Sequence, residues 1–540
     1  MKNLLKNYWQ WGVIIILGIM VSWPLMRSGY FSHQDDLQVI RIVEMRKCFS
    51  DLQIPCRWVP DMGWGNGMPL FNFYGVATYY LGGLLSFIFG YIISAKILFF
   101  LALVVGSFGI YLLVNELWGK YAGLTSAILY MYAPYKALDI YVRGALAESI
   151  ALTIIPFVFY FFLKKKYKFF ILTLFLFLIT HNIMTIIFIP VLFMWALYCL
   201  YQDKFRDIKF AIISFAIAFG LSSFFVLPAF LEKDLVQTES LTRFELDYRA
   251  NFVSVGKLFL DRMWGYGTSI PGPEGGMNFQ IGWPHWLLAI ISLVFVFNKK
   301  TEKKQKFLIL STFLIFILSA LMIHNKSTFI WEKISILTFF QFPWRFLSLS
   351  IFTSSILGGF VIYSIKEKYR LLIAVLLIAL TVVLNWSYFK PREFYAVSDV
   401  DKTTGELWET QRRGAILDYL PKTALEPREG APISPLITSG KAAISSFENK
   451  SNRWKFNIKV LETSIVEVPV YYFPNWEVRV NGEKYPFKYD NILGRIAIEL
   501  KQGEYKVSGN FRNTTIRNIA NLITILSLVG LITIWKNYKN

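Results

Sequence analysis

Residues 97–114 read Ile97-Leu-Phe-Phe-Leu-Ala-Leu-Val-Val-Gly-Ser-Phe-Gly-Ile-Tyr-Leu-Leu-Val114 and carry no charge. The hydrocarbon core of a bilayer is about 30 Å thick and takes about 20 apolar residues per helix, so this stretch predicts a membrane helix at 94–115. Similar stretches recur along the 540 residues, which are 55% hydrophobic and 18% aromatic, with a mean hydropathy of +0.44. This composition excludes a single soluble core and predicts an α-helical polytopic membrane protein.

We expect about twelve membrane helices, and the first begins with basic residues as a signal peptide would. No small-x-small cleavage site follows Val21-Ser-Trp-Pro24, so we expect this helix to remain as an anchor. The expected helices are 10–29, 94–115, 121–134, 145–163, 169–181, 183–201, 210–230, 284–298, 307–323, 344–365, 371–388 and 515–536.

The distribution of Lys and Arg predicts the orientation of these helices, because basic loops are retained on the cytoplasmic side. The apolar stretch 71–92 would add one crossing and move the basic run at 164–168 outside, so we interpret it as an interfacial helix or a re-entrant hairpin. Both termini are then cytoplasmic, and the net charge of +20 reflects topology rather than nucleic-acid binding. The basic clusters are Lys164, Lys165, Lys166 and Lys168; Lys299, Lys300, Lys303, Lys304 and Lys306; Lys204, Arg206 and Lys209; Lys366, Lys368 and Arg370; and the terminal Lys2, Lys6, Lys536 and Lys539.

This topology divides the chain into three parts. They are a helical membrane domain at 1–388 with outer loops at 30–93, 135–144 and 231–283, an extracytoplasmic domain at 389–514, and a last helix with a cytoplasmic tail at 515–540. The outer domain is polar, interrupted by Pro and Gly, and alternates in hydrophobicity, as in Trp454-Lys-Phe-Asn-Ile-Lys-Val460.

Alternation with a period of two is typical of half-buried strands, and Asn481-Gly482 between two such segments is a strong hairpin signal. The outer domain is therefore predicted to be mainly β, a small β-sandwich. Its expected strands are 454–460, 464–472, 476–480, 483–487, 494–499 and 503–508.

The motif His33-Gln-Asp-Asp36 follows the first helix and places two adjacent carboxylates, Asp35 and Asp36, at the mouth of the membrane domain. Acidic residues at that depth are costly to desolvate unless they pair, bind a cation or do chemistry; the alternative is a solvated loop start. The pair could ligate Mg²⁺ or Mn²⁺ through oxygen. Further along this loop, Trp64 and Asn66 could stack on and hydrogen-bond a sugar, or Trp64 could lie at the membrane interface.

Three more polar features are expected at the same outer face. Asp139, Arg143 and Glu148 flank the start of a helix near 145, where they could also form a purely structural ion-pair network. His181-Asn182 occupies a turn between apolar helices, and a helix cap is the alternative to a ligand role. Arg345, in Gln341-Phe-Pro-Trp-Arg-Phe346, could bind a lipid phosphate bidentately or simply snorkel.

Cysteine positions leave one question open. Cys48 and Cys56 both fall in the first outer loop, where oxidation is permitted, but the sequence does not decide whether they form a disulfide. Cys199 lies within an apolar helix as a small apolar residue. The segment Pro271-Gly-Pro-Glu-Gly-Gly276 cannot be helical and could be a mobile gate or a plain connector. No phosphate-binding loop, dinucleotide motif or zinc spacing is present.

Taken together, these features resemble the GT-C superfamily of lipid-dependent membrane glycosyltransferases. Within it, the chain is similar to the bacterial YfhO-like proteins and to membrane proteins labelled as 6-pyruvoyl-tetrahydropterin synthase-related. The resemblance covers nearly the whole chain and is carried by Tyr141-Val-Arg-Gly-Ala-Leu-Ala-Glu148, Thr180-His-Asn182, Gln341-Phe-Pro-Trp-Arg-Phe346 and Tyr472-Phe-Pro-Asn-Trp476. Pterin chemistry is not expected, because His33, His181, His285 and His324 show no paired ligand spacing.

The resemblance implies a function. A sugar would be transferred from a polyprenyl-phosphate carrier to an envelope glycan, lipid or protein at the outer face of a bacterial cytoplasmic membrane. The alternatives are a lipid or polysaccharide flippase or transporter, and a non-catalytic envelope scaffold. A transporter is disfavoured because the sequence has neither an internal repeat nor charge at the bilayer midplane.

The resemblance also implies roles for residues. Asp35 or Asp36 would take the proton of the acceptor hydroxyl, while Asp139 or Glu148 would orient the acceptor or support a cation. Arg345, with Arg143 or His181, would neutralise the departing phosphate. The remaining candidate substrate contacts are His33, Asn182 and Trp64.

Overall fold

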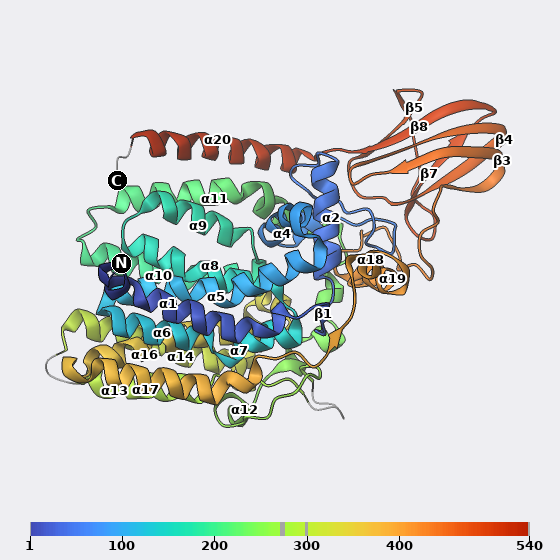
Figure 1. Cartoon of the computed structure of the whole chain (residues 1–540). Coiled ribbons are helices and arrows are strands. Elements are labelled where there is room, and N and C mark those ends of the chain that lie inside the picture. The colour runs from blue at the N-terminus through green and yellow to red at the C-terminus, as the bar shows by residue number, and fades with distance from the viewer. Residues whose placement is uncertain (1, 271–275, 298–300, 538–540) are drawn as a thin grey trace.

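The computed structural model describes residues 2–270, 276–297 and 301–537. It contains a bundle of long helices with a β-sheet domain projecting from one end (Figure 1). A helix forms in each of the regions where the apolar pattern predicts one. These helices are α1 (Lys2–Ser22), α5 (Tyr91–Trp118), α6 (Lys120–Met131), α8 (Leu146–Leu163), α9 (Tyr167–Leu178), α10 (Asn182–Gln202), α11 (Ile208–Leu231), α13 (Trp283–Val296), α14 (Lys303–Ile323), α16 (Leu347–Ser364), α17 (Glu367–Asn385) and α20 (Thr515–Asn537).

Among the described residues, nine helices are long and apolar enough to cross a membrane. Helices α6, α9 and α13 have 12, 12 and 14 residues and, at 1.5 Å per residue, are shorter than a bilayer core. The first helix begins earlier than the predicted 10–29, and the 3₁₀ turn η1 (Trp23–Met26) follows it, with Pro24 near its start. The chain is thus a multi-helix protein with the composition of a membrane protein.

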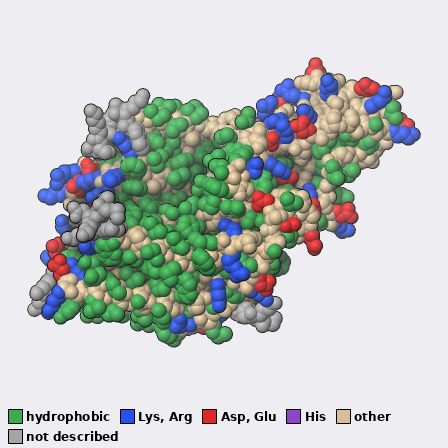
Figure 2. All heavy atoms as spheres, viewed as in Figure 1, with side chains coloured by type: hydrophobic (Ala, Val, Ile, Leu, Met, Phe, Trp, Pro, Cys, Tyr) green, Lys and Arg blue, Asp and Glu red, His purple; other side chains and the backbone are tan. Residues whose placement is uncertain are grey.

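Helix α16 forms the centre of the bundle, since every residue from Leu347 to Ile362 is buried. Small residues permit this packing: a Cβ on Gly358 or Gly359 would collide with side chains of α6, Leu129 and Ser126. In contrast, α17 and α20 lie at the outside of the bundle with exposed apolar side chains, as the hydrophobic surface in Figure 2 illustrates. Such surfaces suit contact with lipid.

The basic turns gather at one end of the bundle. The turns between α8 and α9, α10 and α11, and α16 and α17 lie at the same end as both termini, opposite the sheet domain (Figures 1 and 2). Lys299, Lys300 and Lys539 fall outside the described residues. The predicted topology places all basic turns on the same side of the membrane, and their position at one end of the bundle agrees with it.

The three predicted outer loops contain short helices, of which only a helix within 71–92 was expected from the sequence. Loop 30–93 contains α2 (Gln38–Ser50), α3 (Leu70–Phe73) and α4 (Ala77–Phe89), and α2 lies across the end of the bundle against α4 (Figure 1). At 135–144, where an outer loop is predicted, the chain forms α7 (Pro134–Ala137) and the π-helix η2 (Leu138–Arg143). Loop 231–283 carries η3 (Lys233–Leu235), η4 (Thr238–Thr242), η5 (Phe244–Leu246), η6 (Tyr248–Asn251) and α12 (Val255–Phe259). Most of the candidate gate, residues 271–275, lies outside the described residues.

Short elements complete the bundle end. Between α14 and α16 lie η7 (Asn325–Ser327), α15 (Thr328–Lys333), η8 (Ser335–Phe340) and η9 (Pro343–Phe346), and η10 (Trp386–Tyr388) follows α17. The chain then returns to the first loop: β2 (Phe394–Tyr395) pairs with β1 (Tyr30–Phe31), and α18 (Asp399–Thr403) and α19 (Gly405–Arg413) pack on α2 before η11 (Ile416–Asp418). This return brings the segment after α17 to the Asp35 loop.

The sheet domain is one antiparallel sheet rather than two separate sheets, so the prediction of a β-sandwich needs correction. Its strands are β3 (Leu436–Asn449), β4 (Arg453–Tyr471), β5 (Trp476–Val480), β6 (Glu483–Lys484), β7 (Arg495–Leu500) and β8 (Gly503–Phe511), in the order β3-β4-β8-β5-β6 with β7 on β4. Strand β3 was not expected. The predicted strands 454–460 and 464–472 are one continuous strand, β4, which pairs first with β8 and then with β7.

One local prediction is confirmed, and one question that the sequence left open is answered. Asn481 and Gly482 join β5 to β6 with φ values of 52° and 91°, as a two-residue hairpin turn requires. Cys48 and Cys56 form a disulfide with their Cα atoms 5.7 Å apart, which ties the end of α2 to the following loop.

Candidate functional site

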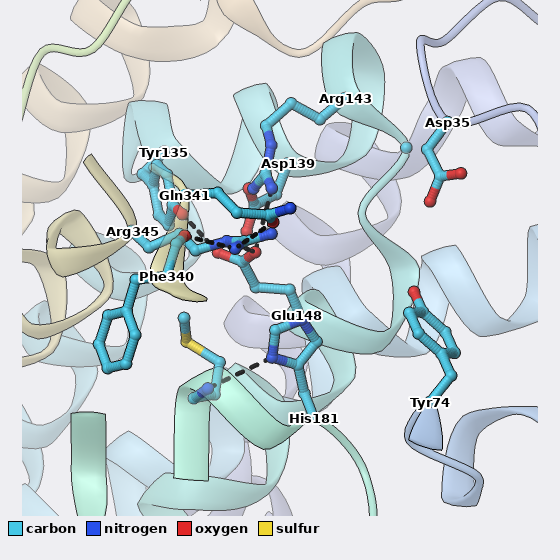
Figure 3. A network of polar contacts seen from close by, with 12 residues as sticks. Asp35, Tyr74, Tyr135, Asp139, Arg143, Glu148, His181, Phe340, Gln341 and Arg345 are labelled. Atoms are coloured by element: carbon cyan, nitrogen blue, oxygen red, sulfur yellow. Dashed lines mark hydrogen bonds and ion pairs between the residues drawn. The ribbon is translucent and has the colours of Figure 1, made fainter. Parts of the chain in front are cut away.

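Four ionisable side chains meet inside the bundle, near the end that carries the sheet domain. We call Asp139, Arg143, Glu148 and Arg345 the buried charge cluster (Figure 3). Arg143 pairs with Asp139 and, through Nη2, with Glu148 Oε2 at 3.1 Å. Arg345 Nε lies 3.4 Å from the same Glu148 oxygen. Two guanidinium groups thus share one carboxylate.

Local structure places the first three of these charges. The π-helix η2 sets Asp139 and Arg143 four residues apart on one face, and single π-turns of this kind are frequent at functional sites. Gly144 then ends the helix at φ 70°, and a Cβ there would collide with His33. Glu148 stands in the first turn of α8, where Tyr135 donates its hydroxyl hydrogen to Oε1.

Arg345 comes from the opposite side of the site, on η9. Its Nη1 donates to Phe340 O at 2.7 Å and to Gln341 Oε1 at 3.2 Å. Gln341 itself has φ 62°, a conformation that is strained for a residue other than glycine. The preceding residue of η9, Trp344, lies under the Arg143 guanidinium, 4.3 Å from ring centroid to Cζ. The motif around 341–346 therefore holds both arginines.

The cluster consists of two carboxylates and two guanidinium groups that pair with one another, and this pairing offsets the cost of burying them. Each of the four residues is at most 8% exposed, so an unpaired charge here would be strongly destabilising. Asp139, Arg143 and Glu148 do form an ion-pair network, which was the structural alternative considered from the sequence. It extends further than expected, because it includes Arg345.

Asp35 is fixed beside this cluster by the backbone. The amide of Asp35 donates to Arg143 O at 2.8 Å, and the amide of Gln34 donates to Val142 O at 2.9 Å. Its carboxylate accepts hydrogen bonds at Oδ2 from Arg41 Nη1 (2.8 Å) and Gln38 Nε2 (2.9 Å). The side chain remains 34% exposed, and Oδ1 has no partner in the described part of the chain.

Asp36 points to different partners. It forms an ion pair with Lys402 of α18 and lies 3.9 Å from His33 Nε2, and His33 also contacts Tyr30 OH at 3.2 Å. Burial lowers the pKa of His33, although Asp36 and Asp35 oppose the shift. The two adjacent carboxylates therefore have separate environments, and Asp36 serves the junction with the C-terminal segment.

His181 and Asn182 stand at the start of α10. His181 Nδ1 accepts from the amide of Met184 at 3.2 Å, which is the helix cap considered from the sequence, and its ring lies beside Glu148 and the two arginines (Figure 3). Asn182 donates to Phe73 O at 2.9 Å. Close packing joins this turn to the first loop, since a Cβ on Gly75 would collide with Thr180 O.

Trp64 is not part of this group. Its indole Nε1 donates to Glu409 Oε2 at 3.0 Å, and Arg413 lies 4.9 Å from its ring, so it packs at the junction with α19. Asn66, which was considered with it, accepts a hydrogen bond from Arg495 at 2.7 Å. Both residues join the first loop to the C-terminal half of the chain.

Sequence reasoning missed four residues next to Asp35. Arg41 lies between the Asp35 carboxylate and the Tyr74 ring, 4.5 Å from the ring centroid. Tyr419 stacks on Phe73 at 5.8 Å, and the adjacent Asp418 lies near Arg41 and Asp35. Burial raises the pKa of Asp418 to about 6; Asp35 adds to the shift and Arg41 opposes it. Of these, only Arg41 could have been singled out from the sequence, because basic residues are uncommon in a loop predicted to be outside.

The donor set does not form a metal site. In the part of the chain that the structure describes, no three His, Cys, Asp or Glu side chains are placed to hold one ion. Asp35 and Asp36 face Arg41 and Lys402 rather than each other. Magnesium or manganese at these carboxylates stays a prediction.

Comparison with known proteins adds little. No protein-family model matches the sequence, and no curated protein matches it, so the YfhO-like and synthase-related families gain no support. A solved structure of the archaeal oligosaccharyltransferase AglB from Archaeoglobus fulgidus, in complex with an inhibitory peptide and a dolichol-phosphate, is similar over 77% of this chain and 64% of that chain, with 14% identity and a TM-score of 0.35. The match thus spans less than two thirds of that protein. At this TM-score the likeness defines neither the fold nor the activity.

Proposed function

We propose that the chain transfers a sugar from a polyprenyl-phosphate carrier at the bundle end that bears the sheet domain. The observation that carries this proposal is the position of Asp35, a partly exposed carboxylate tethered by its own amide to Arg143 of the buried charge cluster. A proton acceptor and two phosphate-binding groups thereby share one region. The location of the basic turns supports placing this end outside the cytoplasmic membrane of a bacterium, with both termini inside.

The proposed reaction is a substitution at the anomeric carbon. The oxygen of the acceptor hydroxyl forms the new bond while the bond from that carbon to the phosphate oxygen breaks. Asp35 Oδ1 takes the hydroxyl proton, and the phosphate leaves with the bonding electron pair. An envelope glycan, a lipid or a protein would supply the hydroxyl.

Arg345 is the candidate ligand for the departing phosphate. Its Nε and Nη1 are held by Glu148, Phe340 and Gln341, whereas Nη2 makes no hydrogen bond within the described residues. A fixed guanidinium with one free edge costs little reorganisation when charge develops on the phosphate. Arg143, stacked on Trp344, adds to the positive field.

Asp139 and Glu148 are positioning residues in this proposal. Both are buried and each holds an arginine, so neither is placed to touch the acceptor. Figure 3 shows His181 beside Glu148 and Tyr74 with its hydroxyl toward Asp35, and in this proposal both contact the sugar phosphate. Asp36, with its lysine partner, is not the proposed base.

Binding of polyprenyl monophosphate to the full chain in detergent tests the phosphate site. Arg345→Gln is expected to weaken binding about tenfold or more, because a charge-assisted hydrogen bond is lost. Arg453→Gln removes a guanidinium from the sheet domain and should bind as the parent does. Equal affinity of Arg345→Gln and the parent would contradict the proposal. Carrier binding without sugar transfer would favour a flippase or a scaffold.

A further inference from the structure

A cavity lies on the sheet domain, away from the buried charge cluster. It has a volume of about 380 Å³ and forms where the chain after β6 separates from β5. The two strands pair only at Arg479–Lys484 and Val480–Glu483, and one further bond joins the Tyr485 amide to Val478 O at 3.0 Å. We call this cavity, lined by residues 475–478, 484, 485, 487 and 512, the sheet-edge pocket.

The lining combines an apolar floor with a polar rim. Trp476 and Val478 are buried, and Tyr485 and Phe487 cover them from the departing chain. The indole Nε1 of Trp476 is buried and finds no acceptor among the described residues. A buried donor without a partner is uncommon in a folded protein.

The charge of the rim selects an anion. Glu477 is the one acidic residue in the lining of the pocket. Its carboxylate pairs with both Arg479 and Lys484, each at 2.8 Å, so two positive charges face one negative charge. These contacts lower the pKa of Glu477 to about 2, the bond from Lys484 contributing most. The guanidinium of Arg512 forms no ion pair within the described chain. The pocket therefore has an excess of positive charge next to apolar surface.

The pocket lies close to the point where the chain would enter the membrane. Arg512 precedes Thr515, the first residue of α20, by three residues, and its amide donates to Asn475 O at 2.8 Å. Three extended residues span about 10 Å, and each headgroup layer is about 5–8 Å thick. Figure 2 shows basic side chains, with acidic ones among them, on the part of the sheet domain next to the hydrophobic body. A phosphate in the headgroup layer is thus within reach of the rim.

We propose that the sheet-edge pocket binds the phosphate-bearing headgroup of an anionic membrane lipid. Arg512 and Lys484 bind the phosphate, and the apolar floor contacts the glycerol and the first methylenes. The bound lipid holds the sheet domain against the membrane surface. This inference depends on α20 crossing the membrane and not on the proposed sugar transfer.

Titration of the full chain in neutral detergent, followed by thermophoresis, tests the proposal. The probes are short-chain phosphatidylglycerol, short-chain phosphatidylcholine and inorganic phosphate. Phosphatidylglycerol should bind most tightly. The double variant Arg512→Ala, Lys484→Ala should bind it about tenfold or more weakly, since charge-assisted hydrogen bonds are lost.

The matched control is Lys455→Ala, Lys459→Ala, which removes two charges from the outer face of β4 and should leave binding unchanged. Arg512→Lys keeps the positive charge and should retain most of the affinity. Retained affinity would also show that a substitution at this position leaves the sheet domain folded. Equal binding of phosphatidylcholine, or of inorganic phosphate, would overturn the lipid assignment. Unchanged affinity in the double variant would overturn the site.

Discussion

Neutralising Glu148 should strongly destabilise the protein. Glu148 is 1% exposed and receives the Tyr135 hydroxyl and two guanidinium groups. Glu148→Gln keeps the side-chain volume but leaves Arg143 and Arg345 with only Asp139 as counter-charge. Removing one partner of a buried ion pair costs about 3–5 kcal/mol, and we expect a loss of this size.

The free energy of unfolding in mixed micelles measures this loss. The control is Glu116→Gln, because Glu116 pairs with Lys164 at 2.8 Å but is 39% exposed, and it should cost no more than about 1 kcal/mol. Adding Arg345→Gln to Glu148→Gln restores charge balance, so the two changes should couple by about 1 kcal/mol or more. Additive losses, or equal losses for Glu148→Gln and its control, would refute the account of the cluster.

Three other changes test separate parts of the structure. Replacing both Cys48 and Cys56 by Ser opens a short loop with a sequence separation of 8, and by chain entropy should cost about 2.5 kcal/mol in unfolding measurements; no loss would contradict the structural role of the bridge. Because the pKa of Asp418 is raised by burial to about 6, from an unfolded value near 3.9, the folded state binds the proton more tightly and loses stability as the pH rises from about 4 to 6. Asp418→Asn should therefore melt higher than the parent at pH 7.5 and equally near pH 4, and a difference independent of pH would be inconsistent with this. Gly75→Ala should lower the melting temperature because its Cβ meets backbone, whereas Gly256→Ala, with open space around it, should not.

The helices could be predicted from the sequence because the relevant signal is local. An uncharged stretch such as 97–114 specifies a helix by its composition, whatever packs against it. The hairpin at Asn481-Gly482 is local in the same sense, since positive φ at both residues is a property of the turn itself. The clustering of Asp139, Arg143, Glu148 and Arg345 could be predicted in part, because the sequence places all four at the outer face.

The remaining errors arise from contacts between distant segments. Lys402 is 366 positions from Asp36, and no local pattern links them, so the different environments of Asp35 and Asp36 could not be foreseen. Strand β4 was divided in two because residues 461–463 are all exposed and interrupt the alternation within a continuous strand. The sequence predicts a loop at Leu138–Arg143 because polar residues usually indicate exposure to water. In the π-helix, Asp139 and Arg143 are instead buried as an ion pair.

The central claim is that Asp35, and not its neighbour Asp36, acts as the base in sugar transfer beside Arg345. The most direct test is transfer of labelled sugar from a polyprenyl-phosphate donor by the full chain reconstituted in liposomes, with an envelope extract as acceptor. The account predicts transfer by the parent, loss of about a hundredfold or more in rate with Asp35→Asn, and substantial activity with Asp36→Asn. Full activity of Asp35→Asn, or equal losses in both variants, would contradict it.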